Sequence, residues 1–175
     1  VGKTTLALAF SKTLSLSYRR MQFTPDVLPA DVTGFSMYSK QTDTFEYREG
    51  AVMCNLFLAD EINRTSPKTQ SALLEVMEEK RVTVDGVTHT LPDPFFVIAT
   101  QNPLGSAGTQ KLPESQLDRF MVKLSMGYPD KESEIRILKE ETKDSLSLIQ
   151  PVLTMEELKQ AQQACEQIHV EDSMY

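Results

Sequence analysis

The chain has 175 residues, of which 40% are hydrophobic and 25% charged, which is typical of a globular domain and excludes a disordered segment. Its 25 acidic residues outnumber its 18 basic ones, and the formal charge of −7 argues against a general nucleic-acid-binding protein, which needs concentrated Lys and Arg. Cys54 and Cys165 lie far apart and only two histidines are present, so neither a disulfide framework nor a structural zinc site is indicated.

The chain starts with Val1-Gly2-Lys3-Thr4-Thr5, which matches the last part of the phosphate-loop pattern G-x-x-x-x-G-K-[ST]. In a complete loop, backbone N–H groups and the N-terminus of the following helix cradle phosphates, while the lysine neutralises their oxygens and the next hydroxyl binds Mg²⁺. The alternative is that Gly2 simply precedes an amphipathic helix. Because a phosphate loop normally follows a central strand, we expect the chain to be a fragment of a longer protein.

The segments that follow predict a strand over 19–24, a short helix over 29–34 and a β-hairpin over 35–50. Residues 55–61 are an apolar run that ends in the adjacent carboxylates Asp60 and Glu61, which indicates a buried strand emerging at a sheet edge. In a nucleotide-binding sheet, Asp60 would hold Mg²⁺ through its water shell and Glu61 would polarise the attacking water. The alternative is a pair of carboxylates that only caps a helix.

A helix is predicted over 66–79, a hairpin over 81–90 around the turn pair Asp85-Gly86, and a second buried strand over 94–100. Gln101 and Asn102 follow this strand, as the carboxylates follow the earlier one. Two apolar runs that both end in polar residues predict an open parallel sheet, whose ligand crevice lies beyond the carboxyl ends of the strands.

Further along, we predict a short helix over 112–120, a strand over 121–126 and amphipathic helices over 131–143 and 155–168. The composition changes at Pro129. We therefore expect an α/β core in residues 1–128 and the start of a helical domain in residues 129–175.

The order of these motifs is more specific than any one of them. Gly-Lys-Thr is followed by Leu-Ala-Asp-Glu-Ile-Asn-Arg, then Ile-Ala-Thr-Gln-Asn-Pro, then Leu-Pro-Glu-Ser-Gln-Leu-Asp-Arg-Phe, and this order resembles the MoxR family of AAA+ ATPases over nearly the whole chain. Gln-Phe-Thr-Pro-Asp at 22–26, the segment at 28–34 and Pro-Lys-Thr-Gln-Ser-Ala-Leu-Leu-Glu at 67–75 are similar to that family too.

The resemblance implies a three-layer α/β P-loop fold with a parallel five-stranded sheet and a helical lid, assembled into a ring that is usually hexameric. It places Asn102 at the sensor 1 position, against the γ-phosphate or the attacking water, and Arg119 at the arginine-finger position, acting on ATP in the neighbouring subunit. The hairpin around Phe45 is similar to an insertion that often reaches the ring pore. The same resemblance assigns Val1, Gly2, Lys3, Thr4 and Thr5 to the end of the Walker A loop, Thr4 and Asp60 to Mg²⁺, and Asp60 and Glu61 to the Walker B pair.

Other interpretations of these residues stay open. Asn102 could only form a turn before Pro103, and Arg119 could only pair with Asp118 or Glu114 on its own surface. The loop from Leu104 to Gln110 is less acidic than is usual in the family, so its contacts do not transfer, and the arginine of sensor 2 would lie beyond Tyr175.

The function implied is a Mg²⁺-dependent ATPase with ATP and Mg²⁺ as cofactors, whose hydrolysis drives chaperone-like remodelling or maturation of a protein partner. MoxR relatives often act with von Willebrand factor A domain proteins. The alternatives are a motor of the magnesium chelatase or helicase type, and a non-hydrolysing, nucleotide-gated interaction module. We expect a reduced, cytoplasmic setting, because the two cysteines indicate no disulfide framework. No apolar stretch approaches the roughly 20 residues that span a bilayer.

Overall fold

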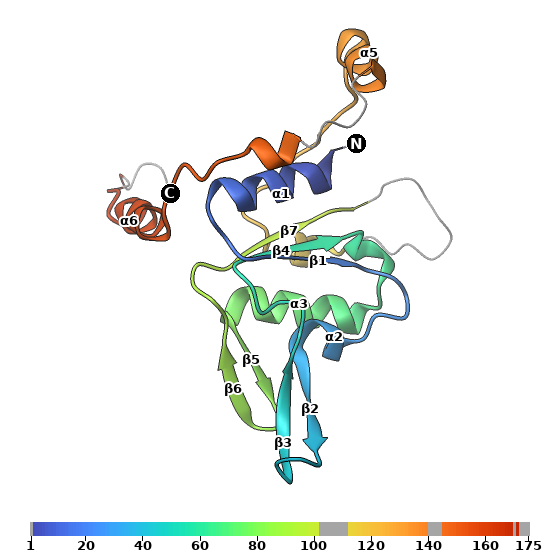
Figure 1. Cartoon of the computed structure of the whole chain (residues 1–175), viewed down its shortest axis with the longest axis vertical. Coiled ribbons are helices and arrows are strands. Elements are labelled where there is room, and N and C mark those ends of the chain that lie inside the picture. Colours follow the sequence, from blue (N-terminus) through green and yellow to red (C-terminus); the bar gives the residue numbers. More distant parts are fainter. Residues whose placement is uncertain (1, 102–111, 140–144, 170, 172–175) are drawn as a thin grey trace.

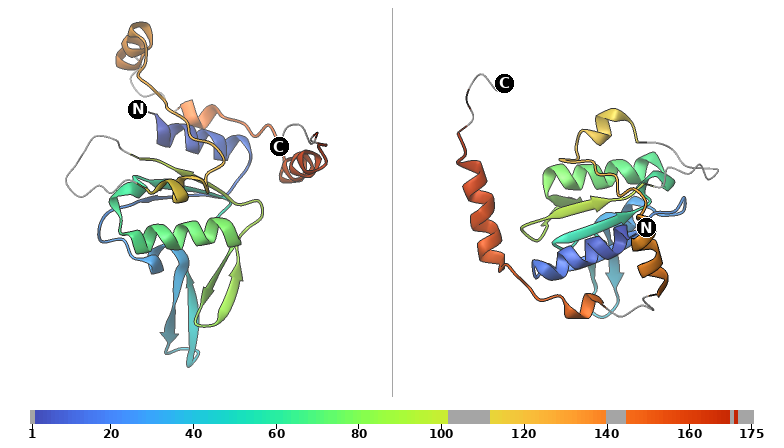
Figure 2. Two further views of the ribbon diagram at one scale, coloured as in Figure 1. Left: turned by 180° about the vertical axis from the view of Figure 1, so that it is seen from behind. Right: turned by 90° about the horizontal axis from the view of Figure 1, so that it is seen from above.

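A computed structural model describes residues 2–101, 112–139, 145–169 and 171 (Figure 1). Its centre is a parallel sheet with the strand order β1-β4-β7, formed by Tyr18–Gln22, Leu56–Asp60 and Phe96–Ala99. Helix α1 (Lys3–Thr13) covers one face of the sheet and α3 (Pro67–Glu79) covers the other (Figures 1 and 2). The fold is therefore the three-layer α/β arrangement that the sequence predicts, and the strands and helices that build it lie where expected.

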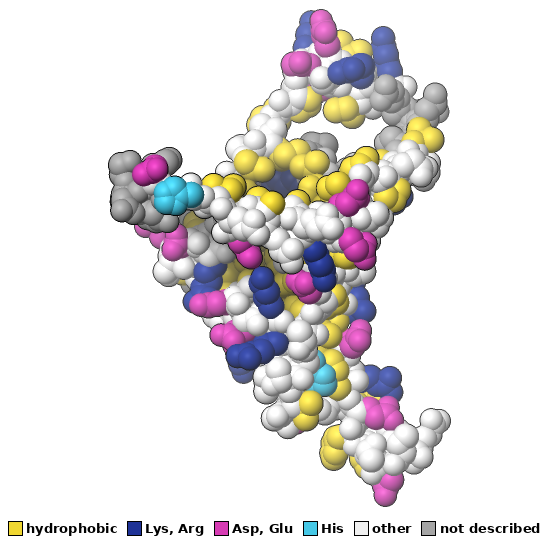
Figure 3. All heavy atoms as spheres, turned by 90° about the vertical axis from the view of Figure 1, so that its left-hand side faces the viewer, with side chains coloured by type: hydrophobic (Ala, Val, Ile, Leu, Met, Phe, Trp, Pro, Cys, Tyr) yellow, Lys and Arg dark blue, Asp and Glu magenta, His cyan; other side chains and the backbone are white. Residues whose placement is uncertain are grey.

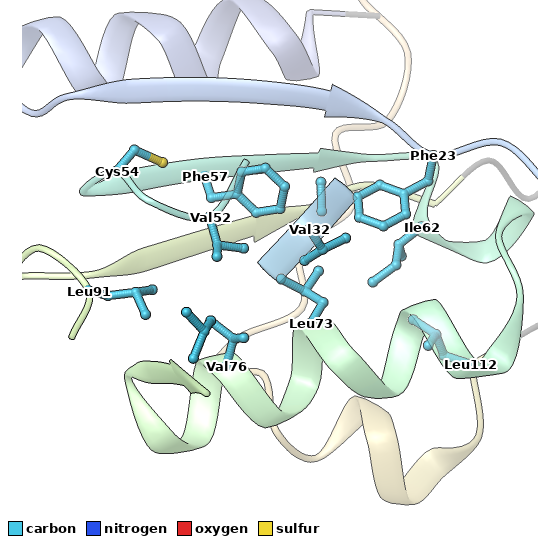
Figure 4. Packing of buried hydrophobic residues seen from close by; sticks show 12 residues of the cluster. Phe23, Val32, Val52, Cys54, Phe57, Ile62, Leu73, Val76, Leu91 and Leu112 are labelled. Atoms are coloured by element: carbon cyan, nitrogen blue, oxygen red, sulfur yellow. The ribbon is translucent and has the colours of Figure 1, made fainter. Parts of the chain in front are cut away.

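The main hydrophobic core lies between the sheet and α3 (Figure 4). Phe57 of β4 is fully buried and meets Phe23 edge to face, with ring centroids 6.4 Å apart. Alternate residues of β4 point to opposite faces of the sheet, so Phe57 and Ala59 join this core while Leu56 joins the other face. Each large aromatic or aliphatic side chain buried in this way stabilises the fold by about 1.5–3 kcal/mol.

Helix α3 begins and ends for identifiable local reasons. Ser66 accepts a hydrogen bond from the backbone N–H of Thr69 at 3.3 Å, and Pro67 occupies the first helical position, where no N–H partner is needed. The helix stops at Lys80, whose backbone is left-handed with φ 51°. Its apolar stripe of Leu73 and Val76 is what packs beneath the sheet.

Two β-hairpins extend side by side below α3 in Figure 1, one following α2 (Pro29–Thr33) and the other following the C-terminal end of α3. Strands β2 (Gly34–Ser39) and β3 (Thr44–Glu49) form one, and β5 (Arg81–Val84) and β6 (Val87–Thr90) form the other. Asp85 and Gly86 both have positive φ, 49° and 79°, which confirms the predicted type I′ turn. The ring of Tyr47 stacks on that of His89 at 3.7 Å between centroids, so the two hairpins touch.

The C-terminal part is helical, as predicted, with less packing against the core. It comprises α4 (Glu114–Leu117), α5 (Lys131–Lys139), the 3-10 turn η2 (Ser145–Leu148) and α6 (Met155–Glu166). The N–H of Val152 donates to the carbonyl of Thr13 at 2.9 Å, and Met155 and Leu158 pack near Leu14. The end of α1 therefore anchors the segment that leads into α6.

The predicted strand over 121–126 is wrong, because these residues form no strand in the structure. A strand needs a hydrogen-bonded neighbour, and in the described part of the chain β7 pairs only with β4, so residues 121–126 form no ladder with its other edge. The side chains of Met121 and Leu124 are 99% and 79% exposed. In the described residues the sheet has three strands, whereas the resemblance implied five.

The surface in Figure 3 shows hydrophobic side chains gathered between α5 and the body of the protein. Many of the exposed hydrophobic residues belong to α1, to the segment after α4 or to α5. They are Leu6, Phe10, Met121, Val122, Leu124, Ile137 and Leu138. Among the described residues, no helix has the length and apolar character needed to cross a membrane.

Candidate nucleotide site

The start of the chain meets the carboxyl ends of β4 and β7. The Nζ of Lys3 donates to the carbonyl oxygen of Gln101 at 3.1 Å, although 98 positions separate the two residues. The hydroxyl of Thr4 lies 3.5 Å from the Oδ2 of Asp60. The carboxyl ends of the two strands therefore lie beside the Gly-Lys-Thr motif, and two residues of this motif meet Gln101 and the first carboxylate of the acidic pair.

Gly2 and Thr5 complete the described part of this motif. Gly2 precedes α1 with φ 85°, a left-handed conformation that glycine adopts without strain, and a Cβ added there would meet no atom within 4 Å. Thr5 lies in the first turn of α1. The N–H groups of a helix's first turn have no partner within the helix and attract anions, so this 11-residue helix presents a suitable end to a phosphate. Val1, also predicted for the loop, lies outside the described residues.

Besides Thr4, two side chains hold Asp60. Thr100 donates its hydroxyl to Oδ1, and Arg20 approaches Oδ2 with its Nε at 3.1 Å and its Nη2 at 2.6 Å. Burial alone would raise the pKa of Asp60, but the hydrogen bonds from Thr100 and Arg20 and the positive charge of Arg20 outweigh it and lower that pKa. Asp60 is therefore an anion at neutral pH, as a cation ligand must be.

Glu61 follows directly and has an unusual backbone. Its φ of 56° is left-handed, a conformation that few residues other than glycine adopt. The hydroxyl of Thr100 accepts the N–H of Glu61 at 2.9 Å, and the carbonyl of Thr100 accepts the N–H of Ile62 at 3.0 Å. These bonds fix the corner at the end of β4. Arg64 donates to the Oε2 of Glu61 at 2.9 Å, which orients the carboxylate beside Asp60.

Arg119 lies elsewhere. It follows α4, which packs on the α3 side of the sheet through Leu112 and Leu117, whereas Lys3 and Thr4 lie on the α1 side (Figure 2). Arg119 forms an ion pair with Glu78 of α3 and not with the nearer acidic residues of its own segment. Its side chain is 42% exposed. Asn102, the predicted sensor residue, lies outside the described residues.

Sequence reasoning missed Arg20, Thr100 and Arg64. Arg20 belongs to a strand whose alternation indicated only structure, and its side chain reaches Asp60 because β1 and β4 pair in parallel with Gln22 opposite Asp60. Thr100 was a strand end without an assigned role. Only the position of Thr100 in the sequence could have indicated its contact with Asp60, because residues at the ends of adjacent parallel strands lie side by side.

Comparisons with known proteins identify the family of the chain. The model of the ATPase family associated with various cellular activities (AAA) matches residues 1–122. YeaC of Bacillus subtilis, a protein described as uncharacterized, is 52% identical over 175 residues, which are 99% of this chain and 55% of YeaC. Chaperone MoxR1 of Mycobacterium tuberculosis is 45% identical over 138 residues, which are 79% of this chain and 37% of that protein.

Among solved structures, that of a candidate ATPase from Cytophaga hutchinsonii superposes with a TM-score of 0.85 at 39% identity. The match covers 99% of this chain and 53% of that one. The chain thus spans about half the length of YeaC and of the solved structure, and less of MoxR1. With the family model matched over most of the chain and relatives that carry the MoxR name, the chain belongs to the MoxR family of AAA+ ATPases.

Proposed function

We propose that the chain forms the nucleotide-binding core of a Mg²⁺-dependent ATPase that couples ATP hydrolysis to chaperone-like remodelling or maturation of a protein partner. One observation carries most of the argument: Lys3 and Thr4 contact Gln101 and Asp60 at the carboxyl ends of two adjacent parallel strands. Open parallel sheets bind their ligands at this edge. The relative named Chaperone MoxR1 supports the link to a protein partner.

The donor atoms of the site suit a nucleotide bound with Mg²⁺. Magnesium prefers oxygen ligands and is usually held by one or two carboxylates together with the phosphates of the substrate. Thr4 and Asp60 supply such oxygens. Among the described residues, no group of three or more His, Cys, Asp or Glu could hold a metal ion. When bound, Mg²⁺ neutralises charge on the phosphates. Lys3 would pair with phosphate oxygens, and Asp60 would hold the ion through its water shell.

Glu61 would orient and polarise the attacking water. In the full-length protein we expect Glu61→Gln to bind ATP with nearly wild-type affinity and to hydrolyse it at least roughly a hundredfold more slowly, because a positioned base contributes about 10²–10⁴-fold. ATP binding and steady-state turnover would be measured on the same preparation. Equal loss of both would instead indicate a folding defect and contradict the role.

We further propose a ring, hexameric as is usual in the family, in which Arg119 acts on ATP bound by the neighbouring subunit. The preceding helix α4 and the ion-pair partner Glu78 of α3 lie on the side of the sheet opposite α1 (Figure 2), which supports action of Arg119 between subunits. Its present partner does not hold it firmly, because an exposed ion pair such as Arg119–Glu78 is worth about 0–1 kcal/mol.

Arg119→Ala should therefore reduce hydrolysis by the full-length ring about 10³-fold or more, as expected for an arginine finger, while ATP binding stays nearly intact. Glu78→Gln is the matched control, since it breaks the same ion pair and keeps the arginine. Unchanged turnover in Arg119→Ala would rule out the finger.

We also propose that residues 129–175 begin the helical lid over the core formed by residues 1–128. The decisive measurement for the whole function is ATP turnover by the full-length protein with and without a candidate partner, such as a von Willebrand factor A domain protein. Turnover that the partner stimulates would support coupling. ATP binding without any turnover would favour a nucleotide-gated interaction module.

A further inference from the structure

The carboxylate of Asp60 is enclosed on several sides. Its side chain is only 13% exposed, and a buried anion without compensating partners is costly. Thr100 occupies Oδ1, which leaves Oδ2 as the oxygen that faces Thr4. Any Mg²⁺ or metal-bound water held by Asp60 and Thr4 together must therefore approach Oδ2.

That oxygen already has a cation beside it. Both the Nε and the Nη2 of Arg20 approach Oδ2, and Nη2 also donates to the Oε1 of Gln22 at 3.0 Å. A guanidinium 2.6 Å from Oδ2 fills space that a hydrated metal ion would need. The Arg20 side chain is 45% exposed, so it can turn into solvent, whereas Thr100 remains on the other oxygen.

We propose that Arg20 is an internal competitor of Mg²⁺: its guanidinium holds Asp60 in the metal-free protein and leaves Oδ2 when magnesium and nucleotide bind. The inference rests on the proposed function. It predicts two opposite effects of removing Arg20, namely a less stable metal-free protein and a higher apparent affinity for magnesium. A purely structural role predicts only the first effect, and a role in binding phosphate predicts weaker nucleotide binding.

The experiment titrates MgCl₂ into the full-length protein at a fixed concentration of a fluorescent, non-hydrolysable ATP analogue. If the guanidinium occupies Asp60 in roughly nine molecules of ten, Arg20→Ala should lower the magnesium concentration for half-maximal binding about tenfold, because apparent affinity scales with the competent fraction. The thermal midpoint of the metal-free variant should also fall. Arg19→Ala is the matched control, since the neighbouring Arg19 contacts Glu49 and the carbonyl of Gly50 instead.

Arg20→Lys keeps the charge without the planar fork and should fall between wild type and Arg20→Ala. If Arg20→Ala does not fold, the lysine variant decides by the same criterion. A magnesium requirement that stays unchanged or rises, while the wild type binds the analogue in a magnesium-dependent way, would overturn this inference alone. A wild type that does not bind the analogue at any magnesium concentration would contradict the proposed function and this inference with it.

Discussion

The two faces of the central sheet differ in how completely they are packed. On the α3 side, Phe23, Phe57 and Leu73 are fully buried in one continuous core. On the α1 side, the buried cluster of the described residues comprises Leu14, Leu16 and Leu56, and the α1 side chains Leu6 and Phe10 remain 53% and 46% exposed. The polar contacts of the candidate nucleotide site lie on this second face. The α3 side therefore provides most of the buried apolar packing of the fold, and the elements of the candidate site are held by less of it.

The largest expected effect tests the packed face. Phe57→Ala should destabilise the protein by about 3–5 kcal/mol, because it removes a fully buried aromatic side chain and leaves a cavity between the sheet and α3. The measurement is the free energy of unfolding from urea or guanidinium denaturation. A loss below 1 kcal/mol would mean that this core is not the source of stability.

An intermediate loss of stability is expected at Asn55, which lies where the three strands of the sheet begin. Asn55 accepts a hydrogen bond from the hydroxyl of Ser17 at 2.8 Å and donates to the carbonyl of Pro94 at 2.9 Å, so it ties together the starts of β1, β4 and β7. Asn55→Ala should cost about 1–3 kcal/mol of unfolding free energy, since buried polar groups lose their partners. Ser17→Ala removes the bond to the Oδ1 of Asn55 and the one that the Ser17 hydroxyl accepts from the N–H of Asn55, but it keeps the bond to Pro94 and should cost less. The reverse order would contradict the assigned role of Asn55.

The smallest effect tests the thinly packed face with the same chemical change as the first. Phe10→Ala on α1 should alter the unfolding free energy by no more than about 0.5 kcal/mol, because its ring is already half exposed. Paired with Phe57→Ala, it isolates the difference between the faces. Equal losses from both variants would show that the two faces contribute alike.

The sequence predicts those parts of the molecule that depend on local pattern. The apolar run before Asp60, the serine and proline before α3, and the Asp85-Gly86 turn each specify an element from neighbouring residues, and each is confirmed. The resemblance to the MoxR family also implied that the Gly-Lys-Thr motif and Asp60 lie together, and Thr4 does lie 3.5 Å from Asp60.

What the sequence does not predict depends on partners distant in the chain. The segment from Met121 to Met126 has the composition of a strand, but composition does not specify the pairing with another strand that a sheet requires. Arg20 acquires its role only through the register that sets β1 beside β4, 40 positions away from Asp60. The partner of Arg119 proved to be Glu78 on another helix, which spacing along the chain could not indicate.

The left-handed backbone of Glu61 has a consequence for engineering. An L-residue in that conformation costs about 1–2 kcal/mol relative to an unstrained one, and glycine would relieve it. Selection of a variant library for thermal stability alone would therefore enrich glycine at this position. Such a selection would yield a sturdier protein without the carboxylate proposed to orient the water, so durability and chemistry favour different amino acids at this single corner.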